Sequence, residues 1–289
     1  MEINLKMDFL SDWIEHLTQQ LFSLGYTPDE SPNKISIQYF NLLKRGVTLT
    51  PRRIYFSKEF SCPEGYKEGL RILIHKIEKG ESLAAHLSKN INKLEYKDPL
   101  LNDWNIHHLH LGTEADKTGF IKRTGPLLFV RFEREEAYFL NTFNHGSWND
   151  LDIVRIIHNN WPQIIDRYRI DAVCSSPAIK TNEQVKEVRK MRSVGFIEPY
   201  PGVVYMPIGM GMTTSGHSIE VVRISDFYYD HIKGLEDIVR EEFATIVETS
   251  ENKGIKIISD LKFQLIFKNG TVKAYDKQYN ITLDFGELP

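Results

Sequence analysis

Residues 127–143, with the sequence LLFVRFEREEAYFLNTF, decide the fold. Two runs rich in aliphatic and aromatic residues, 127–132 and 137–143, flank the charged segment 133–136, and this pattern predicts a β-hairpin. Just upstream, the sequence IHHLHL at 106–111 is typical of a further strand and is followed by Gly112. We therefore expect residues 106–143 to form an antiparallel meander.

Helices and further strands are expected on both sides of this meander. Apolar residues at spacings of three and four predict helices over 9–24, 64–79, 82–91 and 149–161, the last of them capped by Ser147 or Asn149. Thr181 and Gln184 have the spacing of a capping box, which predicts a helix to about Ser193 with Gly195 at its stop position. Extended segments are expected at 53–56, 203–206 and 219–224, an acidic helix at 226–247, and a hairpin at 261–276 with an Asn269-Gly270 turn.

These elements predict an α+β protein. A helix-rich basic N-terminal region is expected over 1–95, the antiparallel meander with its helix over 96–170, and an α+β region over 171–289. The 289 residues, 41% of them hydrophobic and 26% charged, exclude a collagen-like, coiled-coil or disordered chain.

The cellular location is inferred from cysteine use and from the N-terminus. Cys62 and Cys174 are the two cysteines, and no CxxC pair occurs. The first residues carry acids where a signal peptide has bases, and no apolar run approaches the roughly 20 residues that span a bilayer. We expect a cytoplasmic protein without membrane association.

The net charge of −3 argues against a globally basic nucleic-acid binder, but charge is uneven along the chain. Residues 34–79 contain ten Lys or Arg and four Glu, whereas residues 226–251 contain eight acids and two bases. One interpretation is a basic RNA-binding surface that includes Arg52, Arg53, Lys58 and Arg71. The other interpretation is two solvated helical faces.

Histidines and arginines gather in the meander. The two-residue period of a strand puts His108 and His110 on one face. With His145 they could bind a metal, but no carboxylate is spaced as in the common metal motifs. Metal-free RNA cleavage fits better, because it needs a general base, a general acid and cations for the developing phosphate charge.

The order of elements over residues 91–149 resembles RelE/ParE-like toxins of the barnase-like ribonuclease group. The resemblance rests on a helix, a strand, a basic turn with Lys122-Arg123, two further strands, and the closing sequence Asn144-His145-Gly146-Ser147-Trp148. It implies an endoribonuclease without metal or cofactor, in a stress or phage-defence context, with RNA and a possible protein partner or inhibitor. We expect His145 as acid or base, Arg131 or Arg123 as the phosphate clamp, and His108 or His110 as the second proton-transfer group.

A glycine-rich segment at 207–218 is a second candidate site. Backbone N–H groups and hydroxyls around Gly209, Gly211, Thr213 and Ser215 could hold an anion, although the segment is also consistent with a tight connection. Two other functions stay open at this point. One is a non-enzymatic interaction protein that binds a partner chain or nucleic acid through its charged faces, and the other is a metal-dependent phosphodiesterase that uses the HxH pair.

Overall fold

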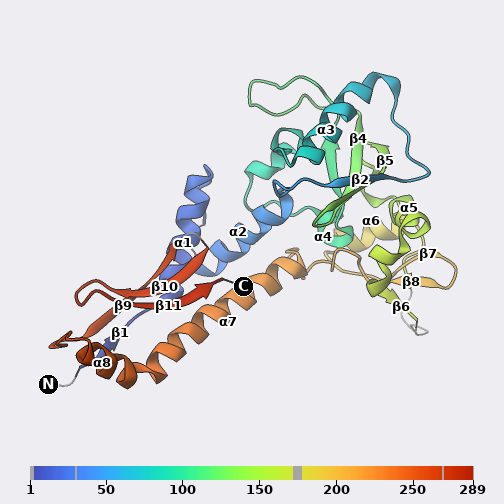
Figure 1. Cartoon of the computed structure of the whole chain (residues 1–289). Coiled ribbons are helices and arrows are strands. Elements are labelled where there is room, and N and C mark those ends of the chain that lie inside the picture. Colours follow the sequence, from blue (N-terminus) through green and yellow to red (C-terminus); the bar gives the residue numbers. More distant parts are fainter. Residues whose placement is uncertain (1–2, 30, 172–177, 269, 289) are drawn as a thin grey trace. The chain divides into compact units, whose positions relative to one another are not determined.

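The computed structural model describes residues 3–29, 31–171, 178–268 and 270–288 (Figure 1). The described chain is α+β, as expected. It forms two compact units: unit 1 comprises Met1–Tyr39 and Arg223–Pro289, and unit 2 comprises Phe40–Val222. This division differs from the boundaries expected near residues 95 and 170, because an N-terminal helix packs with a C-terminal sheet in one unit.

The helices and strands have the following bounds. The α-helices are α1 (Phe9–Ser23), α2 (Pro32–Arg45), α3 (Lys67–Lys79), α4 (Pro99–Trp104), α5 (Asp152–Asn160), α6 (Asn182–Lys190), α7 (Ile219–Glu241) and α8 (Phe243–Asn252). The strands are β1 (Leu5–Lys6), β2 (Arg53–Phe56), β3 (His107–His110), β4 (Pro126–Phe132), β5 (Glu136–Asn144), β6 (Arg169–Ile170), β7 (Ile197–Tyr200), β8 (Val203–Tyr205), β9 (Leu261–Lys268), β10 (Thr271–Asp276) and β11 (Ile281–Glu287).

The meander is confirmed at the centre of unit 2. Strands β3, β4 and β5 pair antiparallel in that order, and β2 joins β5 in parallel. Leu128 and Val130 of β4 pack against α3, which covers one face of the sheet. Leu127 and Phe129 point to the opposite face and pack in a core with α4 and α5. Unit 2 also holds a small three-stranded sheet in the order β6-β8-β7.

Unit 1 is built on a four-stranded sheet in the order β1-β9-β10-β11 (Figure 1). The expected hairpin at 261–276 is present as β9 and β10, although Asn269 of its turn lies outside the described residues. Helix α1 packs on β9, with the rings of Trp13 and Phe267 5.3 Å apart. The same tryptophan stacks on Tyr228 of α7 at 5.5 Å, so it links the two helices to the sheet.

Several local expectations were wrong. Residues 82–91 form two short 3-10 turns, Ala84–His86 and Lys89–Asn92, instead of a helix. Residues 219–224 begin α7 instead of forming a strand. Val221 and Ser225 are buried four residues apart, which is the spacing of one helix face, and such packing overrides the β-propensity of the β-branched residues.

Two helix ends also differ from expectation. The capping box of Thr181 and Gln184 is present, but Arg192, with φ of 51°, takes the left-handed position expected for Gly195. Neither Ser147 nor Asn149 caps α5, because both lie in a separate 3-10 turn and Leu151 is the N-cap.

Among the described residues, no helix combines the length and the apolar character that a membrane span requires. Cys174 lies outside those residues.

Candidate functional site

The histidines of β3 alternate between the two faces of the central sheet. His108 pairs with Phe129 and His110 pairs with Leu127, so both lie on the face that packs against α4 and α5. His107 and Leu109 lie on the α3 face. The expected placement of His108 and His110 on one face is therefore confirmed.

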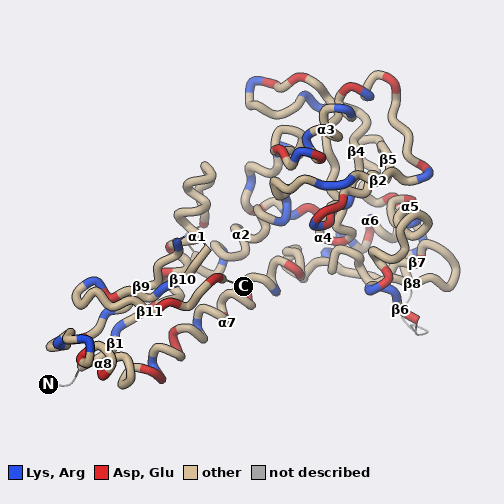
Figure 2. The backbone as a smooth tube through the Cα atoms, viewed as in Figure 1, with Lys and Arg blue, Asp and Glu red and all other residues tan. Residues whose placement is uncertain are grey.

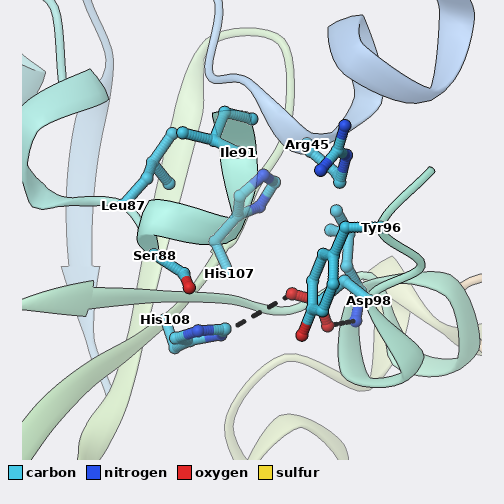
Figure 3. Close-up of a pocket in the computed structure, with 9 residues that line it drawn as sticks. Arg45, Leu87, Ser88, Ile91, Tyr96, Asp98, His107 and His108 are labelled. Atoms are coloured by element: carbon cyan, nitrogen blue, oxygen red, sulfur yellow. Dashed lines mark hydrogen bonds and ion pairs between the residues drawn. The ribbon is translucent and has the colours of Figure 1, made fainter. Parts of the chain in front are cut away.

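Asp98 connects His108 to the beginning of α4. One carboxylate oxygen of Asp98 accepts hydrogen bonds from the backbone N–H groups of Leu100 and Leu101, both at 3.1 Å, and so caps the helix. The other oxygen lies 3.9 Å from Nδ1 of His108, and both side chains are nearly buried (Figure 3). At 3.9 Å the two groups are not hydrogen-bonded, and Nδ1 of His108 is a buried atom without a hydrogen-bond partner in the described chain, so Asp98 acts on this ring through its charge.

Three influences set the proton affinity of His108. Burial lowers the pKa of His108, while the negative charge of Asp98 raises it and the nearby His145 lowers it further. The net pKa of His108 is below the ordinary value for histidine. His108 is therefore neutral at pH 7, which is the state that a general base requires.

His145 lies in the turn that follows β5. Its backbone N–H donates to the carbonyl of Gly125 at 3.0 Å, and Gly146, with φ of 105°, turns the chain in a conformation that favours glycine. The exposed ring of His145 contacts Trp148 edge-on, with ring centroids 5.1 Å apart. Trp148 also contacts His108 at 4.5 Å, so one indole separates a buried imidazole from an exposed one.

His110 and His107 are held neutral by burial. Burial is the main cause that lowers the pKa of each ring to about 4. Nδ1 of His110 accepts a long hydrogen bond of 3.4 Å from the backbone N–H of Thr124. His107 lines a cavity of about 30 Å³ beside Arg45 and Tyr96, which has room for about one water molecule (Figure 3). Burial lowers the pKa of both His108 and His110, and His108 differs from His110 in having the Asp98 carboxylate nearby, whose charge raises its pKa.

Arg131 lies in the interior and not at the site. Its side chain is 0% exposed, and Nε donates to the Glu133 carboxylate at 2.8 Å. Its Nη1 lies 3.4 Å from the carbonyl oxygen of Trp104 and 3.3 Å from that of Ile208. A phosphate could not reach this guanidinium, so Arg131 is a structural residue. Of the two arginines expected as a phosphate clamp, Arg123 is exposed, lowers the pKa of His110 through its charge and has no ion pair among the described residues.

The glycine-rich segment is a tight connection that caps α4. The N–H groups of Gly209 and Gly211 donate to the carbonyls of Asp103 and Asn102, at 2.8 and 3.0 Å. Thr213 donates its N–H to His217, and its hydroxyl contacts that of Ser215 at 2.8 Å. The anion-binding expectation is not supported, because the amides that would hold an anion already satisfy the last carbonyls of a helix.

The basic segment does not form a single basic surface. Arg52 is buried and donates to the carbonyls of Thr48, Thr50 and Glu133, so it braces a loop against the sheet. Arg53 pairs with Glu136 at 3.2 Å and Arg71 pairs with Glu68 at 2.7 Å. Lys58 is exposed. In Figure 2 the bases and acids of α3 and its surroundings are interspersed. Of the four expected RNA contacts, Arg52 is excluded by burial, and Arg53 and Arg71 already have carboxylate partners.

Metal binding by the HxH pair has no support in the described part of the chain. No group of three or more His, Cys, Asp or Glu side chains there could hold a metal ion.

Sequence reasoning missed Asp98, although an Asp before a Pro at a helix start is a recognisable N-cap pattern. It also missed Trp148 as the contact between the two histidines, which depends on how the turn after β5 folds back.

Comparisons with family models, curated proteins and solved structures gave no significant match to this chain.

Proposed function

We propose that this chain is a metal-independent endoribonuclease of cytoplasmic RNA whose site comprises His108, His145 and Arg123, with Asp98 as a positioning residue. The observation that carries the proposal is the contact of His108 and His145 with the same indole, at 4.5 and 5.1 Å. The charge of His145 also lowers the pKa of His108, so the two rings are close enough to interact. One buried imidazole near a carboxylate and one exposed imidazole suit the two proton transfers of RNA cleavage.

In the proposed reaction His108 accepts the proton of a ribose 2′-hydroxyl. The 2′-oxygen then forms a bond to the adjacent phosphorus while the bond from phosphorus to the 5′-oxygen breaks. His145 donates a proton to that leaving oxygen, so that the products are a 2′,3′-cyclic phosphate and a 5′-hydroxyl. Arg123 stabilises the charge that develops on the phosphate. Atoms and protons balance without a metal ion or cofactor.

Cleavage of purified RNA with and without a chelator tests the proposal. We expect cleavage that the chelator does not change, and a decrease of about 10²-fold or more in His145→Ala, as for loss of a general acid. His108→Asn, chosen because it keeps a polar side chain beside Asp98, should lose activity to a similar extent. The matched control is His75→Ala, because His75 is an exposed histidine of α3 outside the site.

The outcomes separate the alternatives. Absence of cleavage by the parent protein, or full cleavage by His145→Ala, would contradict the proposal. Cleavage that the chelator abolishes would favour a metal enzyme instead. In a stress or phage-defence role, expression should arrest growth, and the same His145→Ala substitution should relieve the arrest.

A further inference from the structure

Unit 1 contains a large cavity that the proposed ribonuclease site does not use. It lies between α1, the first turns of α2 and the part of α7 that belongs to unit 1, and its volume is about 680 Å³. Cavities of roughly 300–1,000 Å³ are typical of sites for small organic molecules. The size alone therefore fits a ligand of metabolite dimensions.

The inner wall of the cavity is mostly apolar. Trp13, Ile14 and Ile37 line it, and Trp13 is almost fully buried. Ser36 and Ser225 are also buried and form a hydrogen bond with each other at 2.8 Å. With these hydroxyls paired, the inner wall offers mainly hydrocarbon and aromatic surface to a ligand.

The charged residues that line the cavity are both acidic. Glu15 of α1 and Asp226 of α7 are exposed carboxylates, and neither makes an ion pair or hydrogen bond within the described ranges. None of the described residues that line the cavity is a Lys or Arg. The negative charge of Glu15 also contributes to raising the pKa of the neighbouring Asp12, although burial is the main cause. Among the described residues, the lining of the cavity therefore carries two carboxylates and no Lys or Arg.

An aromatic ring lines the same cavity. Tyr229 lines the cavity one turn along α7 from Asp226, and its side chain is 50% exposed. The exposed face of a tyrosine attracts a cation through the ring quadrupole. Carboxylates, a free aromatic face and an apolar wall together complement a ligand with a positive head and a hydrocarbon body.

We propose that this cavity binds an amphipathic organic cation, a protonated amine with an apolar body. The ammonium group is held by Glu15 and Asp226 beside Tyr229, and the apolar part lies against Ile14, Ile37 and Trp13. The proposal is independent of RNA cleavage, because all these residues belong to unit 1.

Calorimetric titration of the full-length chain tests this proposal at pH 7 and low salt. The probe is hexylamine, which is protonated at this pH, and it is compared with hexanol and hexanoate, which have the same hydrocarbon chain. We expect saturable binding of one hexylammonium per chain, with hexanol at least tenfold weaker and hexanoate weaker still. The double variant E15Q/D226N should lose about tenfold in hexylammonium affinity, whereas D237N/E241Q, which neutralises two acids of α7 outside the cavity, should retain it.

Three results would overturn the proposal. The first is equal binding of hexylammonium and hexanol, which would show a merely apolar cavity. The second is unchanged affinity in E15Q/D226N when circular dichroism shows that the variant is folded. The third is binding of a basic amphipathic peptide without binding of hexylammonium, which would make the surface a protein-docking site. Because the readout is binding and not RNA cleavage, failure here leaves the ribonuclease proposal untouched.

Discussion

Replacement of Arg131 by methionine separates its structural role from a role in phosphate binding. Methionine keeps a long unbranched side chain in the space but removes all guanidinium donors. The carbonyls of Trp104 and Ile208 then lose their hydrogen bonds to Nη1, and the Glu133 carboxylate loses its partner at 2.8 Å. Glu133 is 32% exposed and can be rehydrated, so its loss is the smaller effect.

The expected cost is set by two opposing effects. Replacing a buried ion pair with apolar groups can be neutral, because desolvation of the charges is avoided. Here only one partner is replaced, and each buried carbonyl that loses its donor costs about 1–3 kcal/mol. Loss of a cation beside the last carbonyl of α4 adds about 0.3–1 kcal/mol. These losses sum to about 2–7 kcal/mol, and the avoided desolvation of the guanidinium offsets part of them. We therefore expect Arg131→Met to lower the free energy of unfolding of unit 2 by about 2–5 kcal/mol.

Chemical and thermal denaturation followed by tryptophan fluorescence measure this effect. Trp104, Trp148 and Trp161 lie in unit 2, so the signal reports mainly on that unit. At about 2–4 °C per kcal/mol for a unit of this size, Tm should fall by roughly 4–20 °C. Arg123→Met is the matched control, and because Arg123 is exposed its stability should stay within about 0.5 kcal/mol of the parent. An Arg131→Met variant with parental stability but without RNA cleavage would refute the structural assignment.

Three further changes are expected to alter stability in defined directions. Gly209→Ala should destabilise the protein by about 1–3 kcal/mol in denaturation, because the added Cβ would lie 2.5 Å from the backbone nitrogen of Asn105. Gly234→Ala, in contrast, should stabilise the protein by about 0.5–1 kcal/mol, because this helical position has open space for a Cβ. Burial holds the pKa of His107 at about 4, so between about pH 6.5 and 4 the unfolded chain binds a proton that the folded chain does not bind. The stability of the fold should therefore fall as the pH falls through this window. His107→Leu should flatten the decline in Tm measured from pH 7 to 4.5. Thr181→Ala should cost about 1 kcal/mol in urea denaturation through loss of the capping box, and no change would show that α6 does not depend on its cap.

Local patterns in the sequence predicted the parts of the fold that local interactions determine. The meander, α1, α3 and the capping box of α6 follow from apolar periodicity and from side chains three residues apart. The segments at 82–91 and 219–224 were assigned wrongly, because their short apolar patterns fit more than one structure and long-range packing selects among these.

The charge pattern predicted less, because sequence does not show which charges are buried. Arg45 and Arg52 belong to the basic segment 34–79 and Arg131 belongs to the meander, yet all three are buried and donate to backbone carbonyls. Arginine suits this use because its planar group offers several donors in fixed directions. A count of bases therefore overestimates the surface that could neutralise RNA phosphates.

Helix α4 shows why the candidate site depends on contacts that are distant in the sequence. Its N-terminus is capped by Asp98, whose second oxygen faces His108, and this end is predictable from the Asp-Pro pair. At its C-terminus the carbonyls of residues 102–104 accept from Gly211, Gly209 and Arg131, and none of these partners is local. A helix of six residues has little stability of its own, so these remote donors hold α4 in place and thereby hold Asp98 beside His108. The glycine-rich segment and Arg131, which the sequence indicated as parts of a site, thus anchor the helix that places Asp98 near His108.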